Sequence, residues 1–224
     1  MRNSVRKTTL LLLMLAAVQV LSAQYTKDLF FVFLNTNPDK PEISESEKEN
    51  LQALHLENLD RLAQQGILHA AGPFDGGGGM LILETDSKEE ALDIVNTDPA
   101  VKAGRFNVEV FPFLLAGNRL CGPKKPYEMV TYQFVRLNSN PEFFGDLDKM
   151  VYDNRVFMVE QNNQNDYVVA YGSFSPYNDG MIIFDFPEGK DAERIIKKHP
   201  AVKAGQLTYE IKPLWIAKGT FCKD

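Results

Sequence analysis

The two side-chain types best suited to acid–base or nucleophilic chemistry near neutral pH, histidine and cysteine, are few in this sequence. The 224 residues include three histidines and two cysteines. Histidine changes its charge near physiological pH, which makes it the most common general acid or base. His55 lies four residues after Leu51 and four and seven residues before Leu59 and Leu62. This spacing places His55 on the apolar face of a predicted helix, where it is either a base in a pocket or a partly buried histidine bonded to a backbone carbonyl.

His69 and the four glycines at 76–79 are weaker candidates for chemistry. His69 lies inside a predicted strand, where packing explains it. The glycines could let the backbone approach a ligand, but they lack the Gly-x-x-x-x-Gly-Lys-Ser/Thr context of a phosphate loop, and a hairpin connection is the simpler interpretation. The sequence also lacks metal-ligand spacings, a nucleophile elbow and a cofactor fingerprint. We therefore expect neither a metal nor a cofactor.

A repeated hexapeptide determines the domain organisation. Pro-Ala-Val-Lys-Ala-Gly occurs at 99–104 and again at 200–205, preceded by Asp98 in the first copy and by His199 in the second. The spacing between the copies stays constant as far as Cys121 and Cys222, without a gap. The chain is therefore predicted to be a tandem duplication of a domain of about 100 residues, a size that can bury its own core.

The order of predicted elements is the same in both copies. Apolar runs give strands, and the Ser-x-x-Glu capping boxes at Ser44 and Ser87 start the two helices of the first copy. The strands of the first copy are expected at 29–34, 67–71, 80–83 and 106–115. In the second copy we expect strands at 129–137, 167–171, 181–185 and 207–214, with helices at about 143–160 and 190–198. Each copy reads β-α-β-β-α-β, the ferredoxin-like split motif.

This order predicts an α+β fold of two ferredoxin-like units. The strands are apolar on both faces, so the face without helices needs a cover, and packing the two sheets together as a fused pseudo-dimer would supply it. The expected domains are a signal peptide at 1–23, a first unit at 24–116, a linker at 117–126 and a second unit at 127–224.

The N-terminal residues predict export. Three basic residues precede an apolar run at 10–21 that ends in Leu-Ser-Ala, which is typical of a cleaved signal sequence and too short to span a bilayer comfortably. We expect a periplasmic or extracellular protein without membrane attachment after cleavage. Its net charge is −6 before cleavage, so nucleic acid is a poor candidate partner. In an oxidising compartment Cys121 and Cys222 could form a disulfide, or they could be two small apolar side chains kept by duplication.

The first copy resembles the YciI-like, or YCII-related, domain family. The resemblance rests on His55-Leu56-Glu57-Asn58-Leu59, Gly66-Ile67-Leu68, Gly72-Pro73, the segment 98–104 and Val110-Phe111-Pro112-Phe113. It implies a dimeric α+β barrel. The family's members are mostly of unknown function, although a histidine and aspartate pair in a pocket has been taken as an active site and one relative performs dehydrochlorination.

Transferred to this sequence, the resemblance implies His55 and Asp98 as the catalytic pair, with Gly72 and Pro73 in a substrate pocket. A carboxylate can fix the imidazole's tautomer and raise its basicity. Asp98 could instead only cap a helix or begin a turn at Asp-Pro. The second copy has His199 in place of the aspartate and no histidine in its first helix, so at most one site is complete.

Two functions follow from these observations. The first is an exported binding or structural module with at most one residual site, and this is the interpretation that export favours because it separates the protein from most cytosolic metabolites. The alternative is a small-molecule hydrolase, lyase or isomerase that uses His55 and Asp98. The expected partners are a small-molecule ligand and the two halves of the chain with each other.

Overall fold

The structure is a computed structural model that describes residues 27–116, 118–123, 125–143, 147–164, 166–174 and 179–222. The expected signal peptide at 1–23 lies outside the described residues. Within the described part, no helix is long and apolar enough to cross a membrane.

The first half has the expected β-α-β-β-α-β order, with one extra short helix before its last strand. Its elements are β1 (Asp28–Thr36), α2 (Glu45–Gln64), β2 (Leu68–Pro73), β3 (Gly79–Thr85), α3 (Lys88–Asn96), α4 (Pro99–Lys102) and β4 (Phe106–Ala116). The extra helix α4 is formed by the first copy of the repeated hexapeptide, because proline at the first helical position is already preorganised for a helix.

The second half repeats this order, including a short helix formed by the second hexapeptide. Its elements are β6 (Met129–Ser139), α5 (Leu147–Gln164), β7 (Val168–Phe174), β8 (Gly180–Phe184), α6 (Gly189–Ile196), α7 (Pro200–Lys203) and β9 (Leu207–Ala217). The strands β5 (Arg119–Leu120) and β10 (Phe221–Cys222) form a separate two-stranded sheet, and Cys121 and Cys222 are joined by a disulfide. The segment expected as a linker thus contains a strand that pairs with the end of the chain.

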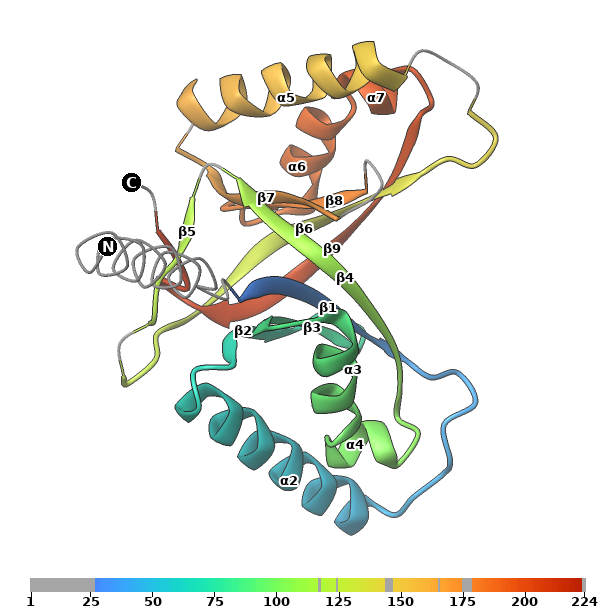
Figure 1. Cartoon of the computed structure of the whole chain (residues 1–224), viewed down its shortest axis with the longest axis vertical. Helices are drawn as coiled ribbons and strands as arrows, with labels where there is room; N and C mark the ends of the chain where they lie inside the picture. The colour runs from blue at the N-terminus through green and yellow to red at the C-terminus, as the bar shows by residue number, and fades with distance from the viewer. Residues whose placement is uncertain are drawn as a thin grey trace, which may run out of the picture.

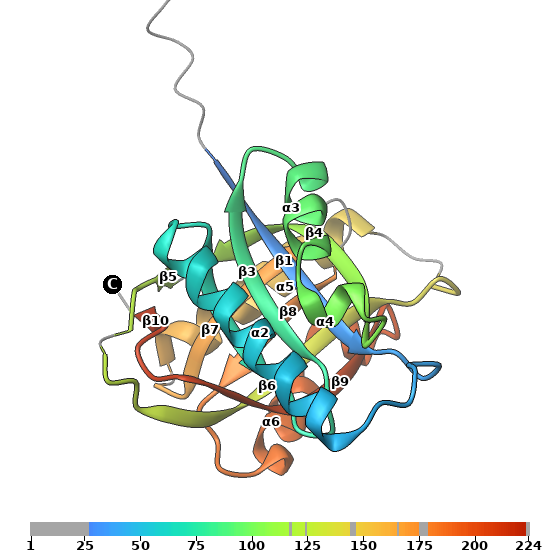
Figure 2. The ribbon, with the colours of Figure 1, turned by 90° about the horizontal axis from the view of Figure 1, so that it is seen from below.

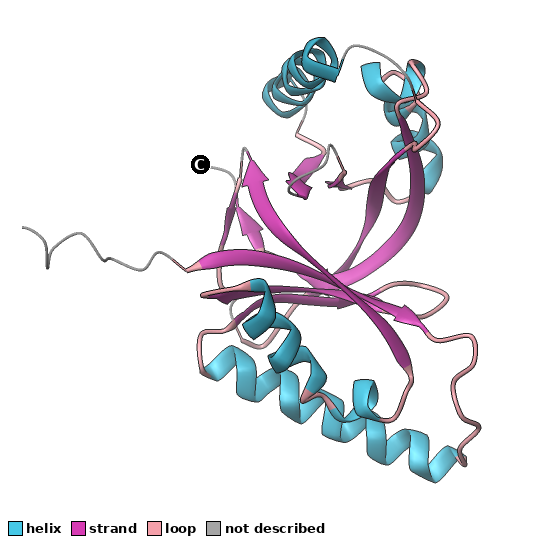
Figure 3. Cartoon of the chain, turned by 45° about the vertical axis from the view of Figure 1, so that its right-hand side comes forward, coloured by secondary structure: helices cyan, strands magenta, loops and turns pink. Residues whose placement is uncertain are grey.

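The strands of the two halves join into one eight-stranded sheet in the order β2-β3-β1-β4-β7-β8-β6-β9. The halves meet where β4 pairs with β7, and a bridge between Phe74 and Leu214 links the β2 end of the sheet to β9. The sheet therefore curls into a barrel, and the helices of the two halves lie outside it at opposite ends of the molecule (Figures 1 and 3). This is the dimeric α+β barrel within a single chain, with the expected α+β fold class.

The two faces of the eight-stranded sheet are buried in different ways. Phe31 and Phe33 of β1 point into the barrel, where they meet Phe113, Phe134 and other aromatic residues. The alternate positions of β1 are covered by the helices of the first half, as the view in Figure 2 shows with α2 and α3 lying across the strands. Burial on both faces explains why the strands are apolar at both parities.

Candidate active site

Helix α2 carries the first candidate side chain. Its N-terminus is fixed by the expected capping box: the Ser44 hydroxyl accepts a hydrogen bond from the Glu47 backbone N–H, and the Glu47 carboxylate accepts one from the Ser44 N–H at 2.8 Å. Leu62 is buried and Leu59 packs against the sheet, so the apolar stripe faces the strands. His55 belongs to this stripe and is held between α2 and the sheet.

Asp98 lies between α3 and α4, and its two carboxylate oxygens have separate partners. Oδ1 accepts hydrogen bonds from the backbone N–H groups of Ala100, at 2.9 Å, and Val101, at 3.4 Å, and thereby caps α4. Oδ2 lies 2.8 Å from His55 Nδ1 and accepts a hydrogen bond from Asn58 Nδ2 at 2.9 Å. The capping role and the histidine contact are thus both present, because each uses a different oxygen.

The pair is well shielded from water. The His55 side chain is 13% exposed and the Asp98 side chain 5%. Burial pushes the pKa of Asp98 upward, but the hydrogen bond and charge of His55, the Asn58 amide and the Ala100 N–H outweigh it and hold the pKa below its usual value. Asp98 is therefore a carboxylate at neutral pH and an acceptor for His55.

This contact determines which imidazole nitrogen is free. A carboxylate can only accept, so the neutral imidazole places its proton on Nδ1 and leaves the lone pair on Nε2. Arg61 strengthens the arrangement by donating to Asn58 Oδ1 at 2.7 Å, which orients the amide that donates to Asp98. The result is a chain of hydrogen bonds that presents Nε2 of His55 as a base.

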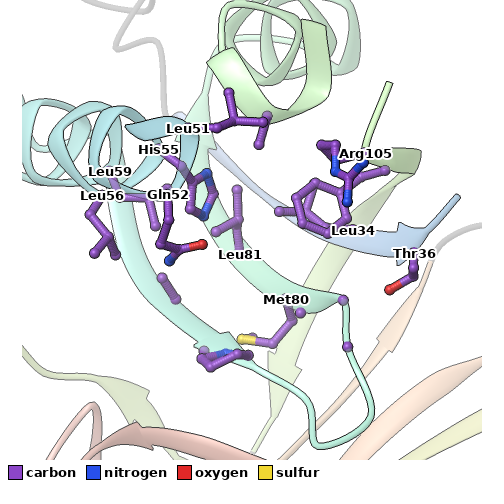
Figure 4. A pocket seen from close by; sticks show the side chains of 18 of the residues that line it. Leu34, Thr36, Leu51, Gln52, His55, Leu56, Leu59, Met80, Leu81 and Arg105 are labelled. Atoms are coloured by element: carbon purple, nitrogen blue, oxygen red, sulfur yellow. The ribbon is translucent and has the colours of Figure 1, made fainter. Parts of the chain in front are cut away.

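His55 lines a cleft of about 610 Å³ between α2 and the strands, within the range of small-molecule sites. Figure 4 shows the imidazole directed into this cleft, with Leu34 and Leu81 beyond it. Gly72 and Pro73, expected in the pocket, also line it. Further lining residues are Thr36, Lys40, Ile43, Lys48, Leu51, Gln52, Leu56, Leu59, Ala71, Gly77, Gly78, Gly79, Met80, Ala100, Arg105, Phe106, Met129 and Trp215.

Met129 and Trp215 reach this cleft from the other half of the chain. They lie near the start of β6 and the end of β9, and the barrel seam brings β9 beside β2. Gly72 marks the closest approach, because a Cβ there would lie 2.8 Å from the Trp215 carbonyl oxygen and 2.7 Å from Leu214 Cδ1. Sequence reasoning missed both residues, since nothing near them in the chain points to His55.

Two other residue groups were underestimated from the sequence. Asn58 is in the motif that carries the family resemblance and lies one helical turn from His55, a spacing that could have identified it. Gly77 and Gly78 have φ of +106° and +77°, and a Cβ at Gly78 would collide with the Leu34 carbonyl oxygen. These glycines form the hairpin between β2 and β3, as expected, and they also form part of the cleft wall.

The second half does not reproduce this pair. His199 precedes α7 as Asp98 precedes α4, but it makes no capping bond, and Asn154 Oδ1 of α5 accepts from the Ala201 N–H at 3.1 Å instead. Burial lowers the pKa of His199 to about 4, so the side chain is neutral at physiological pH. A smaller cleft of about 220 Å³ lies beside it.

The third histidine, His69, lies outside the cleft. His69 Nε2 lies 2.7 Å from Glu84 Oε2 on the neighbouring strand and is not among the residues that line the cleft. Among the residues described by the structure, no group of three or more histidine, cysteine, aspartate or glutamate side chains could hold a metal ion.

The fold is a dimeric α+β barrel, and His55 and Asp98 lie at a cleft in its first half. The YCII-related domain model matches residues 29–114, which contain His55 and Asp98. The uncharacterised protein YjpA of Bacillus subtilis (strain 168) is 45% identical over 57 residues, which are 25% of this chain and 67% of YjpA. The chain belongs to the YCII-related family, and the match lies in its first half.

Two solved structures are similar in overall shape. A proposed monooxygenase from Lactobacillus acidophilus NCFM has a TM-score of 0.47 at 12% identity, covering 89% of this chain and 99% of that one. A proposed chlorite dismutase has a TM-score of 0.49 at 9% identity, covering 86% and 94%. These similarities are too weak to assign an activity to this chain.

Proposed function

We propose that this protein is a small-molecule enzyme in which His55 moves protons in the cleft of the first half. The observation that carries the proposal is the 2.8 Å contact between His55 Nδ1 and Asp98 Oδ2, on an imidazole that lines the cleft. A base held in one tautomer by a buried carboxylate is the arrangement that general acid–base catalysis needs.

The lining residues favour proton transfer at carbon over covalent catalysis. Thr36 supplies the only hydroxyl among the described residues that line the cleft, and it lies on the other side of the cleft from His55 in Figure 4. Among the described lining residues, no hydroxyl or thiol is therefore paired with the imidazole in the manner of a triad.

Three reactions fit a base of this kind. In isomerisation, His55 Nε2 takes a proton from carbon, the electron pair remains as an enolate or dienolate, and the proton returns to a different carbon. In elimination, the same electron pair forms a C=C bond while a leaving group departs with its own bonding pair. Activation of a water molecule for hydrolysis uses the same nitrogen and is the third possibility.

Deuterium incorporation tests this proposal without knowledge of the substrate. The protein is incubated in D₂O with a panel of enolisable lactones, ketones and unsaturated acids, and exchange is followed by mass spectrometry. We expect exchange into at least one compound, and a decrease of about 10²–10⁴-fold in His55→Gln. His69→Gln is the matched control and should retain the rate. Exchange that survives His55→Gln would contradict the proposal.

The second candidate function is a binding or structural module. The observation that favours it is the second half, where His199 replaces the aspartate and no His–Asp pair is formed. A ligand that binds in the cleft of the first half but shows neither exchange nor turnover would favour this function over the enzyme.

We further propose that the protein is exported. The basic and apolar pattern of residues 1–23 supports this, and so does the disulfide between Cys121 and Cys222, since disulfides persist in oxidising compartments. N-terminal sequencing of the protein from cell fractions tests the proposal. A mature protein that begins near Gln24 outside the cytoplasm is expected, and an intact N-terminus in the cytoplasmic fraction would contradict it.

A further inference from the structure

The charges that line the His55 cleft differ from those of the chain as a whole. The sequence has 30 acidic and 24 basic residues. The cleft is nevertheless lined by Lys40, Lys48 and Arg105, and no aspartate or glutamate is among its described lining residues. Asp98 lies behind the imidazole, where its carboxylate contacts His55, Asn58 and the Ala100 N–H. The cleft is therefore a local site of positive charge in an acidic protein.

Among the described residues, two of the three cations have no carboxylate partner. Lys48 pairs with Glu45 at 2.6 Å, but both side chains are exposed, so this ion pair is weak. Lys40 and Arg105 form no ion pair within the described residues. One guanidinium nitrogen of Arg105 donates to the Pro41 carbonyl, which orients the group and leaves its charge uncompensated. Arginine in this state offers a planar fork that matches a carboxylate.

Most of the remaining wall of the cleft is apolar, with Thr36 and Gln52 as polar exceptions. Leu34, Leu81 and Phe106 form part of it, and Figure 4 shows Leu34 and Leu81 in the region between His55 and Arg105. Trp215 also lines the cleft while 52% of its surface is exposed, as is 55% of Leu56. Large apolar side chains left in contact with water beside a cleft are the usual mark of a ligand surface.

We propose that the ligand of this cleft is a small organic monocarboxylate with an apolar or aromatic body. Its carboxylate binds Arg105 and Lys40, and its body lies along the leucines and against Trp215, which places its carbon skeleton beside His55 Nε2. This inference names the substrate class of the proposed enzyme, and it rests on that proposal in taking the His55 cleft as the working site.

Binding of phenylacetate compared with phenylacetamide tests this inference. The two compounds have nearly the same shape and differ in charge. Affinity is measured by titration calorimetry, and the fluorescence of Trp215, the one tryptophan of the sequence, reports binding next to this side chain, which lines both this cleft and a neighbouring pocket. We expect saturable binding of the acid that perturbs Trp215 and is about tenfold tighter than binding of the amide. Equal affinities, or no saturable binding of the acid, would overturn the inference.

Charge variants locate the preference for the acid. Arg105→Gln should reduce the ratio of the two affinities toward one by weakening only the acid, and Lys40→Gln, at an exposed position, should reduce it to a smaller extent. Lys102→Gln removes a positive charge from α4 outside the cleft and is the matched control. A preference that persists in both Arg105→Gln and Lys40→Gln would overturn the inference.

The variant His55→Gln separates this inference from the proposed function. His55→Gln should keep the preference for the acid while it loses deuterium exchange. Acid binding that depends on Arg105 without any exchange in the unsubstituted protein would leave the carboxylate site in place and overturn the enzyme. Exchange that depends on His55 without any preference for the acid would support the enzyme and overturn the inference of a carboxylate ligand.

Discussion

Asp98 and His199 occupy equivalent positions, each immediately before a Pro-Ala-Val-Lys helix, yet only the Asp98 side chain caps the helix that it precedes. In the second half Asn154 of α5 supplies the missing acceptor to Ala201. The turn is thus kept in both halves by different side chains. In the first half the carboxylate that caps the helix also contacts His55. The turn is therefore a structural feature of both halves, and the His55 contact is an additional feature of the first half.

The first prediction concerns the tautomer of His55. In Asp98→Asn the side chain can still cap α4 through its oxygen, but it then presents an N–H donor to Nδ1 and favours the opposite tautomer of the imidazole. We expect ¹⁵N NMR to show the proton on Nδ1 in the unsubstituted protein and on Nε2 in the variant. Deuterium exchange should decrease about 10²–10⁴-fold in the variant. An unchanged ¹⁵N spectrum of His55 would contradict the contact.

The second prediction concerns pH and His199. Burial lowers the pKa of His199 to about 4 in the folded protein from its ordinary value of 6.5, so the unfolded chain takes up a proton first as the pH falls. Protonation of His199 therefore favours the unfolded chain. The free energy of unfolding should be at its full value above about pH 6.5 and should decrease by about 3 kcal/mol in total as the pH falls toward 4. Urea unfolding measured at several pH values checks this dependence.

Two variants separate this dependence from that of the His55–Asp98 pair. His199→Gln should remove the loss of stability between about pH 6.5 and 4. Asp98→Ala should act in a different window, because the pKa of Asp98 is lowered from 3.8 and its contribution persists until the pH falls below that value. If His199→Gln leaves the slope between pH 6.5 and 4 unchanged, His199 is not buried in its neutral form.

The third prediction concerns the seam of the barrel. A methyl group at Gly72 would lie 2.7 Å from Leu214 Cδ1 and 2.8 Å from the Trp215 carbonyl oxygen, and the backbone oxygen cannot yield as a flexible side chain can. Gly72→Ala should destabilise the protein by about 1–3 kcal/mol in thermal or urea unfolding. Gly122→Ala is the control, because a Cβ there has no atom within 4 Å, and a similar effect in both variants would argue against the close approach of β2 and β9.

The fourth prediction concerns the disulfide. Cys121 and Cys222 are separated by 101 residues, and a disulfide that closes this loop lowers the conformational entropy of the unfolded chain. In the chain-entropy description, a loop of this length raises the free energy of unfolding by about 4–5 kcal/mol. The double variant Cys121→Ser and Cys222→Ser should lose stability of this order in urea unfolding. Mass spectrometry under non-reducing conditions should find the protein two hydrogens lighter than its reduced form, and two free thiols would contradict the pairing.

The sequence predicts much of each half because the relevant signals are local. The capping box of Ser44 and Glu47, the apolar alternation of the strands and the hexapeptide at 99–104 each depend on residues a few positions apart. The second half was harder to delimit, and its first helix runs from Leu147 to Gln164 where 143–160 was expected. Residues 143–149 contain no Ser-x-x-Glu pattern to mark its start.

By itself the sequence determined the duplication, the order of strands and helices and, through the family resemblance, His55 and Asp98 as partners. Only the tertiary structure decided that the same carboxylate caps α4, that Trp215 of the second half lines the cleft of the first, and that Arg105 faces the same space as His55. The physical reason is that helices, turns and strands follow from short-range sterics and hydrogen bonds, whereas a cleft is formed by packing between segments that are distant in the chain.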